Sequence, residues 1–490
     1  MRLKLVALLL LALLPAPAPC QSEGDRAARV RRVETGLLTY NVVRGEAPAR
    51  HTIEERMRHY RVPGVSVAVV NDGKLEWAKG YGVREAGADG PVTAETLFQA
   101  ASVSKPVAAV AALRLVQQGV LKLDEDVNLR LRSWKVPENE FTRAEKVTLR
   151  RLLSHSAGTT VFGFLGYGAG EPVPTLVQIL NGEPPANNKP VRVNAAPGGG
   201  FRYSGGGLTV AQLLLVDVTG RAFPDLLRET VLAPVRMGRS TFAQPLPAEL
   251  AREAATGHEA DGAVLRGRYH TYPEMAAAGL WTTPSDLARF GIEIQRALAG
   301  DAERVLSPET ARQMLTPQAK NYGLGVWVEG EGGDIWFTHS GANAGFQMVF
   351  VMSARGGRGA VVMTNGDAGY DLGAEVVRAV AREYGWSRYG PNERDAISPG
   401  AEVLAQLAGT YAEAGAGADK KSLRVSVEGG VLTATSNLWR WGGRELRANT
   451  PTSYFFLDGP GELNFERDLA GKVVAAVIYG SGDPLRLIRQ

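Results

Sequence analysis

The sequence predicts a mixed α/β (α+β) body followed by a small antiparallel β-barrel, and three observations carry this prediction. Residues 64–83 are largely apolar apart from the turn Asn-Asp-Gly at 71–73, which is typical of a β-hairpin. Short apolar segments over 324–363, followed by a helical pattern at 373–384, predict further strands and a closing helix. Residues 401–490 alternate apolar and polar side chains between glycine-containing turns, which favours a barrel.

The first twenty residues have the pattern of a cleaved signal peptide. Two basic residues precede the apolar stretch 5–14, and a Pro/Ala segment then leads to Cys20. An apolar stretch of this length is too short to span a bilayer. Cys20 as a lipid-modified anchor is the alternative, although Pro19 fits that poorly. We therefore expect a periplasmic or secreted protein, and no intramolecular disulfide because Cys20 is the one cysteine.

The remaining chain divides by composition. The segment after the signal peptide is polar and is expected to be a mobile lead-in, and the Gly/Pro/Asn-rich stretch after Arg388 is expected to be a linker. Helices are expected at 50–60 and 305–315, with helices and Gly/Pro-rich loops over 120–270. The expected boundaries are 1–20, 21–45, 46–388, 389–400 and 401–490.

Composition excludes some classes of function. The chain has 490 residues, 44% hydrophobic and 22% charged, with a formal net charge of +4. These values are ordinary for a globular protein, and no basic run is present that would favour nucleic-acid binding. The histidines lack an HExxH pattern or other metal-ligand spacing, so neither a metal nor another cofactor is expected.

Ser102 and Lys105 form the most informative motif, Ser-Val-Ser-Lys, at an expected helix start. Residues three apart lie on one face of a helix, one turn from each other. A serine hydroxyl needs a base to become a good nucleophile, and a lysine in a partly dry site can lose its proton near neutral pH. The same spacing also occurs at ordinary helix starts, so the motif needs support from elsewhere in the chain.

Tyr203-Ser204-Gly205 and His339-Ser340-Gly341 supply that support. Together with the serine–lysine motif, they occur in the order in which the serine β-lactamase and penicillin-binding protein superfamily carries SxxK, YxN and KTG or HxG. Over roughly residues 50–385 the sequence resembles the class C β-lactamase-like branch, which includes D-aminopeptidases, D-alanyl-D-alanine carboxypeptidases and esterases. The resemblance implies a β-lactamase/transpeptidase-like two-lobe fold, with 401–490 similar to a lipocalin-like appendage.

The resemblance also implies roles for individual residues. Ser102 would attack a carbonyl group, with Lys105 and Tyr203 as the base system. The backbone N–H groups of Ser102 and Ala342 would form the oxyanion hole.

His339 would take the place of the lysine in KTG, either orienting Tyr203 or holding a substrate carboxylate. Its ordinary pKa of about 6.5 would then govern the acidic limb of the pH–rate profile. Ser340 and Gly341 would contact substrate, with Gly341 allowing close approach to the strand edge.

Two further positions need comment. Gly205 stands where the family usually has asparagine, which puts β-lactam hydrolysis in doubt more than ester or amide hydrolysis. His155 lies in a Ser-His-Ser-Ala-Gly segment that is usually a structural loop behind the site.

We therefore expect an exported serine hydrolase that forms an acyl-enzyme at Ser102. Its partner would be a small-molecule or peptide substrate, and we expect amide or ester bonds of D-amino-acid or cell-wall-type compounds to be cleaved. A β-lactamase, or a slow-turnover penicillin-binding or cell-wall-recognition protein, remains an alternative.

Overall fold

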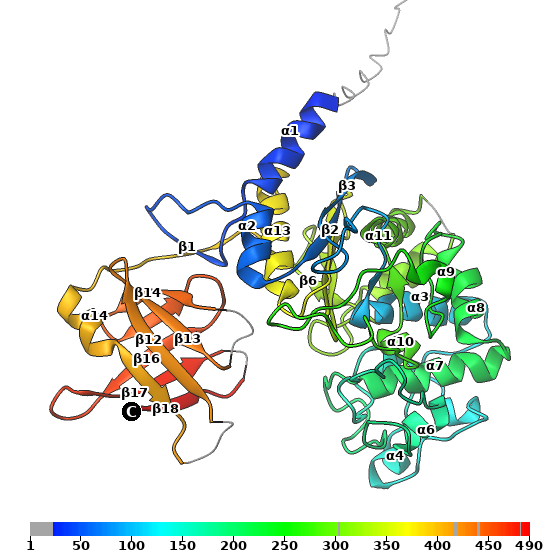
Figure 1. The fold of residues 1–490 in the computed structure, drawn as a ribbon. Helices are drawn as coiled ribbons and strands as arrows, with labels where there is room; N and C mark the ends of the chain where they lie inside the picture. Colours follow the sequence, from blue (N-terminus) through cyan, green and yellow to red (C-terminus); the bar gives the residue numbers. More distant parts are fainter. Residues whose placement is uncertain (1–22, 302–303, 416–419, 439–441, 481) are drawn as a thin grey trace, which may run out of the picture.

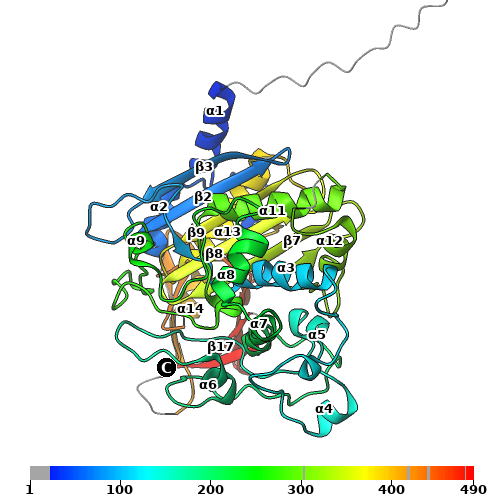
Figure 2. The same ribbon diagram turned by 90° about the vertical axis from the view of Figure 1, so that its right-hand side faces the viewer.

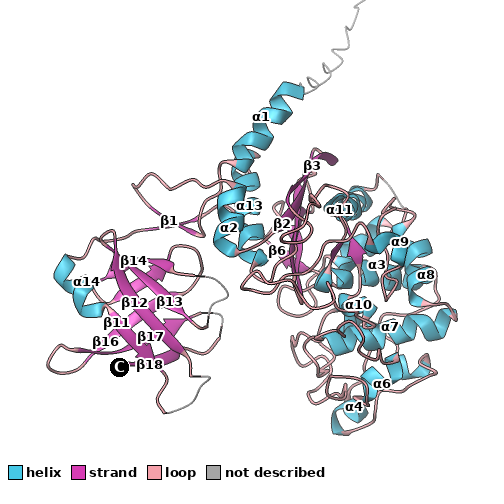
Figure 3. Ribbon diagram, viewed as in Figure 1, coloured by secondary structure: helices cyan, strands magenta, loops and turns pink. Residues whose placement is uncertain are grey.

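The structure, a computed structural model, describes residues 23–301, 304–415, 420–438, 442–480 and 482–490. It shows a mixed α/β body and a separate closed barrel, on the right and left of Figure 1. Figure 3 shows how helices and strands alternate in the body, whereas the barrel is almost entirely strand. The expected signal peptide, with Cys20, lies outside the described residues.

A six-stranded antiparallel sheet forms the centre of the body. In spatial order its strands are β3 (Lys74–Gly82), β2 (Gly64–Asn71), β9 (Gly359–Thr364), β8 (Phe346–Ser353), β7 (Trp336–Asn343) and β6 (Trp327–Glu329). The predicted hairpin is present as β2 and β3. β2 pairs on its other side with β9, so the sheet combines strands from both ends of the body.

Helices cover both faces of this sheet, which is why β2, β8 and β9 are almost wholly apolar. One face packs against α2 (Ile53–Tyr60) and α13 (Gly369–Glu383). The other packs against α11 (Pro284–Ala299), with α3 (Ser104–Gln117) in the same core (Figure 2). The strands and closing helix expected from the sequence are therefore present, with shifted ends.

A helical lobe is inserted between the two halves of the sheet, and most of it lies in the lower part of Figure 2. It contains α4 (Glu140–Ala144), α5 (Leu149–Leu153), α6 (Leu176–Asn181), α7 (Gly205–Thr219), α8 (Phe223–Leu227), α9 (Ala248–Ala251) and α10 (Met275–Ala278). A two-stranded sheet of β4 (Phe98–Gln99) and β5 (Trp281–Thr282) joins the two ends of this insertion. Among the described residues, none of the helices combines the length and the apolar character needed to cross a bilayer.

The segment expected to be a mobile lead-in is structured from Glu23 onward. It forms α1 (Glu23–Glu34), which contacts α13, and β1 (Asn41–Val43), which pairs in parallel with β10 (Asn392–Arg394). Val33 and Leu37, four residues apart, are fully buried, and Arg32 is paired with Glu383 at 2.6 Å. The polar composition of this segment therefore reflects an exposed helix face with ion pairs.

The C-terminal region is a closed antiparallel barrel of eight strands. They are β11 (Gly409–Ala412), β12 (Ser422–Glu428), β13 (Val431–Ser436), β14 (Arg444–Thr450), β15 (Ser453–Phe456), β16 (Glu462–Arg467), β17 (Val473–Tyr479) and β18 (Leu485–Arg489). Side chains fill its interior, and α14 (Ala401–Leu407) adds Leu404 and Leu407 to this core. The barrel has its own packed core.

Asn41 connects the barrel to the body. This side chain is fully buried, and its Nδ2 donates hydrogen bonds to the carbonyl oxygens of Phe456 (2.7 Å) and Gly459 (3.0 Å). Asn392 Nδ2 donates to Asn41 Oδ1 at 2.7 Å, so both strands of the β1–β10 pair are engaged at this joint. Because the buried amide of Asn41 has hydrogen-bond partners on both its nitrogen and its oxygen, it fixes the barrel to the body at this point.

Candidate active site

Ser102 lies on a tight turn between the small β4–β5 sheet and helix α3. It occupies the 3₁₀ turn Ala101–Val103, so α3 begins two residues later than Ser102 itself. Ala101 has a φ of 47°, which is unfavourable for a residue with a Cβ. Ser104 holds this turn, since its Oγ donates to Ala101 O (2.6 Å) and accepts from Leu280 N (3.0 Å).

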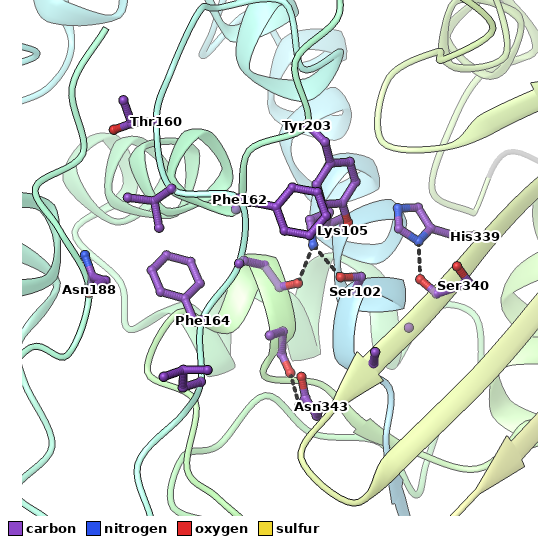
Figure 4. Close-up of a pocket in the computed structure, with 18 of the residues that line it drawn as sticks. Ser102, Lys105, Thr160, Phe162, Phe164, Asn188, Tyr203, His339, Ser340 and Asn343 are labelled. Carbon is purple, nitrogen blue, oxygen red and sulfur yellow. Dashed lines mark hydrogen bonds between the residues drawn. The ribbon is translucent and has the colours of Figure 1, made fainter. Parts of the chain in front are cut away.

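Lys105 is buried directly beside Ser102. Its Nζ donates to Ser102 Oγ at 2.8 Å and to the carbonyl oxygen of Ala277, on α10, also at 2.8 Å (Figure 4). The β4–β5 pairing places α10 here, because Ala100 N donates to Leu280 O. Burial lowers the Lys105 pKa from 10.5 to about 7. The amine is therefore largely neutral in mildly alkaline solution and can accept a proton from the serine.

Tyr203 lies just before α7 and reaches the same serine. Its phenol lies near enough to Ser102 for the serine to affect the phenol pKa, and Lys105 Nζ lies 4.9 Å from the centre of its ring. Burial raises the Tyr203 pKa above its ordinary value, by more than the nearby Ser102 lowers it. The phenol thus stays protonated where the lysine is already neutral, which suits a proton donor.

His155 belongs to this site more closely than the sequence indicated. Its ring centre lies 4.2 Å from that of Tyr203, and its Nδ1 accepts a hydrogen bond from Ser204 N at 3.1 Å. Burial first, and then the charge of Lys105, lower its pKa well below the ordinary value. His155 is therefore a neutral side chain that packs against the tyrosine. Ser-His-Ser-Ala-Gly was the available signal, but nothing in it specifies this contact.

His339, on β7, has a different partner and a different pKa from those expected. Its Nδ1 faces a carbonyl oxygen, Ser340 O, at 2.6 Å and must donate, so its Nε2 accepts from Tyr322 Oη at 3.1 Å. The ring centres of His339 and Tyr203 are 6.2 Å apart. Burial, followed by the charge of Lys105, lowers the His339 pKa to about 3. The expected titration near pH 6.5 is therefore wrong, because the imidazole is buried and lies near the charge of Lys105.

The open edge of β7 runs past Ser102. β6 pairs with β7 only as far as Thr338, whereas β8 pairs along its whole length to a two-residue turn after Asn343. Ladder hydrogen bonds alternate in direction along an antiparallel strand, which leaves the Ala342 N–H pointing to the open edge. This geometry is compatible with the oxyanion hole expected from Ser102 and Ala342.

Gly341 has a packing role that the sequence did not indicate. A Cβ built at this position would lie 2.4 Å from the carbonyl oxygen of Ala100 and 3.1 Å from the Cβ of Ala101. Glycine is therefore required so that β7 can pass close behind the turn that carries Ser102. Gly341 also lines the cavity, and its expected contact with substrate stays a prediction.

The absence of a side chain at position 205 is explained by the loop that contains Phe162 and Phe164, which packs against it. A Cβ there would lie 3.0 Å from Cε2 of Phe164, and Gly205 N donates to Phe162 O at 2.9 Å. A longer side chain would collide with Phe164. The lysine contact that the family's asparagine would make is made here by the carbonyl oxygen of Ala277.

These groups surround one cavity of about 1680 Å³. All the site residues expected from the sequence line it, namely Ser102, Lys105, Tyr203, His339, Ser340, Gly341 and Ala342. The remaining wall is mostly apolar and includes several aromatic side chains from the helical lobe and from β6. No group of three or more potential metal ligands occurs within the described part of the chain.

Comparison with known proteins gives three findings. The family model described as Beta-lactamase matches residues 49–383. Penicillin-binding protein 4 of Amycolatopsis lactamdurans is 28% identical over 388 residues, which cover 74% of this chain and 95% of that protein. Two solved structures share the fold: an octameric penicillin-binding protein homologue from Pyrococcus abyssi (TM-score 0.59, 22% identity, 89% of this chain and 98% of that one), and D-amino acid amidase from Ochrobactrum anthropi SV3 with L-phenylalanine (0.56, 20%, 74% and 98%).

Proposed function

Because this chain belongs to the β-lactamase family of serine hydrolases, we propose that it is an exported enzyme that forms an acyl-enzyme at Ser102. It would hydrolyse an ester or amide bond in a D-amino-acid or cell-wall-type compound. The observation that carries the proposal is the buried Lys105, whose Nζ lies 2.8 Å from Ser102 Oγ and whose pKa of about 7 leaves it able to accept a proton.

Acylation would begin when Ser102 Oγ attacks the substrate carbonyl carbon and its proton passes to Lys105 Nζ. The carbonyl oxygen would become an oxyanion, stabilised by the N–H groups of Ser102 and Ala342. Both backbone groups are held before substrate arrives, the first by the turn at Ala101 and the second by the β7–β8 ladder. They therefore need little reorganisation in the transition state.

Collapse of this intermediate would expel the leaving group, which needs a proton. Tyr203 is suited to supply it, because burial keeps its phenol protonated and it lies near Ser102 in the same cavity. The phenol would then regain its proton from Lys105, whose Nζ lies close to the tyrosine ring. A water molecule would repeat the sequence on the acyl-enzyme and release the acid.

Similarity supports the substrate class, and the N-terminal pattern supports export. The names of the similar proteins refer to penicillin binding and to a D-amino acid amidase. The basic, apolar and small-residue order over residues 1–20 is that of a signal peptide.

A substrate panel tests the function. Wild type should hydrolyse one or more of a set of p-nitrophenyl esters, D-amino-acid anilides and a chromogenic cephalosporin. Ser102→Ala should lose at least about 10³-fold in turnover because the nucleophile is gone. A fluorophosphonate should add its mass to wild type but not to Ser102→Ala. Ser426→Ala, on barrel strand β12, is the matched serine control and should behave as wild type.

Labelling of Ser102→Ala at the wild-type rate would contradict the proposal and assign the nucleophile to another serine. Stable acylation by the cephalosporin with no turnover of any ester or anilide would favour a slow penicillin-binding protein instead.

A further inference from the structure

One wall of the cavity carries large apolar side chains that no other part of the described chain covers. Phe162 and Leu165 line the cavity and are 74% and 73% exposed. The ring centre of Phe162 lies 5.0 Å from that of Tyr203. In Figure 4, Phe162 lies beside Tyr203 and Phe164 lies on the same side of Ser102. Clustered apolar side chains open to a cleft are typical of a ligand-binding surface.

The backbone beneath these side chains is held in place. Gly205 N and Gly206 N, at the start of α7, donate to Phe162 O (2.9 Å) and Val161 O (3.0 Å), and Ser204 Oγ donates to Thr160 O at 2.6 Å. The residue before Ser204 is the site tyrosine itself. The apolar wall and the catalytic phenol are therefore positioned by one anchored segment.

The charge of the cavity has one sign. Besides Lys105, it is lined by Lys189 and Arg192, and no aspartate or glutamate lines it among the residues that the structure describes. Lys189 is exposed, and Arg192 uses its Nη1 only for the carbonyl oxygens of Leu180 (3.3 Å) and Val191 (2.8 Å). Neither positive charge is therefore neutralised within the cavity.

We infer that this cavity selects esters or amides that have a bulky apolar group next to the reacting carbonyl, an anionic group beyond it, and no free ammonium group. Phe162, Phe164 and Leu165 would contact the apolar group, and Lys189 and Arg192 would attract the anion. A substrate ammonium would find no carboxylate here. This inference rests on the proposed function and narrows its substrate class to blocked, acidic compounds rather than free D-amino acid amides.

A series of three compounds that differ only in the group on their amino nitrogen tests whether the cavity prefers a negative charge there. The p-nitroanilides of D-phenylalanine, N-acetyl-D-phenylalanine and N-succinyl-D-phenylalanine share one scissile bond and one ring but carry a positive, a neutral and a negative N-terminal group. Inhibition of p-nitrophenyl acetate hydrolysis gives a binding constant for each, whether or not the anilide is cleaved. We expect the succinyl compound to bind at least about tenfold more tightly than the free amine, and added salt to reduce this difference. Equal or tighter binding of the free amine would overturn the inference.

Two variants of cavity residues show which side chains are responsible for the charge preference and for binding of the apolar group. Lys189→Gln should reduce the preference for the succinyl over the acetyl compound, and Phe162→Ala should weaken binding of both. Lys74→Gln and Leu129→Ala, exposed residues outside the cavity, are the matched controls and should leave all constants unchanged. An undiminished succinyl preference in Lys189→Gln would remove that lysine from the site. Failure of the proposed function looks different, because p-nitrophenyl acetate would then be hydrolysed equally by wild type and Ser102→Ala.

Discussion

Replacing Lys105 with methionine should abolish turnover and change how the stability of the protein depends on pH. Burial lowers the pKa of this lysine from 10.5 to about 7 in the folded state. As pH falls from 10.5 to 7, the unfolded chain takes up a proton that the folded protein does not, so wild type loses stability over that interval and loses no more below it. At about 1.4 kcal/mol per pH unit, three units would give about 4 kcal/mol. Titration is incomplete at both ends of the interval, so the loss between pH 10 and pH 7 is about 3 kcal/mol.

Methionine does not titrate, so Lys105→Met should gain about 3 kcal/mol in unfolding free energy relative to wild type between pH 10 and pH 7. The hydrogen bonds to Ser102 and Ala277 are lost at every pH, and they therefore cancel from this difference. Urea unfolding at several pH values measures it. Lys74→Met, the same change at an exposed lysine, is the control and should show a much smaller pH dependence.

Lys105→Arg separates charge from proton transfer. Arginine keeps the positive charge but cannot lose its proton near neutral pH. At pH 8 most Lys105 is neutral, whereas an arginine with a pKa above 12 would be neutral in about one molecule in 10⁴ or fewer, so kcat/KM should fall at least about 10³-fold. The base assignment would be refuted by near-wild-type turnover of Lys105→Arg, or by a stability difference between Lys105→Met and wild type that stays constant from pH 7 to 10.

Two other predictions concern His339 and the barrel. Because His339 is neutral above about pH 3 while Lys105 titrates near pH 7, His339→Gln should keep the acidic limb of kcat/KM near pH 7; a pH–rate profile in which that limb moves by a full pH unit would reassign it to the histidine. A chain that ends at Arg388 should stay soluble and be acylated at Ser102, but thermal unfolding should show a loss of at least about 1–2 kcal/mol, because β1 loses its partner strand β10 and Asn41 loses its barrel acceptors. Insolubility would mean instead that the barrel covers an apolar face of the body.

Local patterns were sufficient for much of the fold. The hairpin turn after β2 and the apolar strands β8 and β9 are evident in the sequence because their signal lies within a few residues. The contact between Ser102 and Lys105 follows in the same way from a spacing of three. α1 was missed because its apolar positions are few and its polar face resembles that of a disordered segment.

Long-range partners could not be predicted. The acceptor for Lys105 is a backbone carbonyl oxygen 172 positions away, at Ala277. Every residue has a carbonyl group, so residue type does not identify this acceptor. His339 is held by Tyr322 rather than by Tyr203, although both tyrosines were visible in the sequence. The Gly205–Phe164 contact likewise depends on how a loop folds back onto α7. Burial is the largest cause of the lowered pKa of both Lys105 and His339, and it depends on the same long-range packing, which is why the histidine was assigned the wrong titration.

The order of strands in the central sheet affects how the protein is made. Val67 of β2 pairs with Val362 of β9, so the first hairpin waits for a neighbour that lies about 300 residues further along the chain. At synthesis rates of about 5–20 residues per second, this wait lasts roughly 15–60 seconds. During that time β2, which is buried in the finished protein, has β3 on one edge but no strand paired along its other edge. A ribosome that stops before residue 359 therefore releases a chain that contains Ser102, the proposed nucleophile, but cannot complete the sheet behind it.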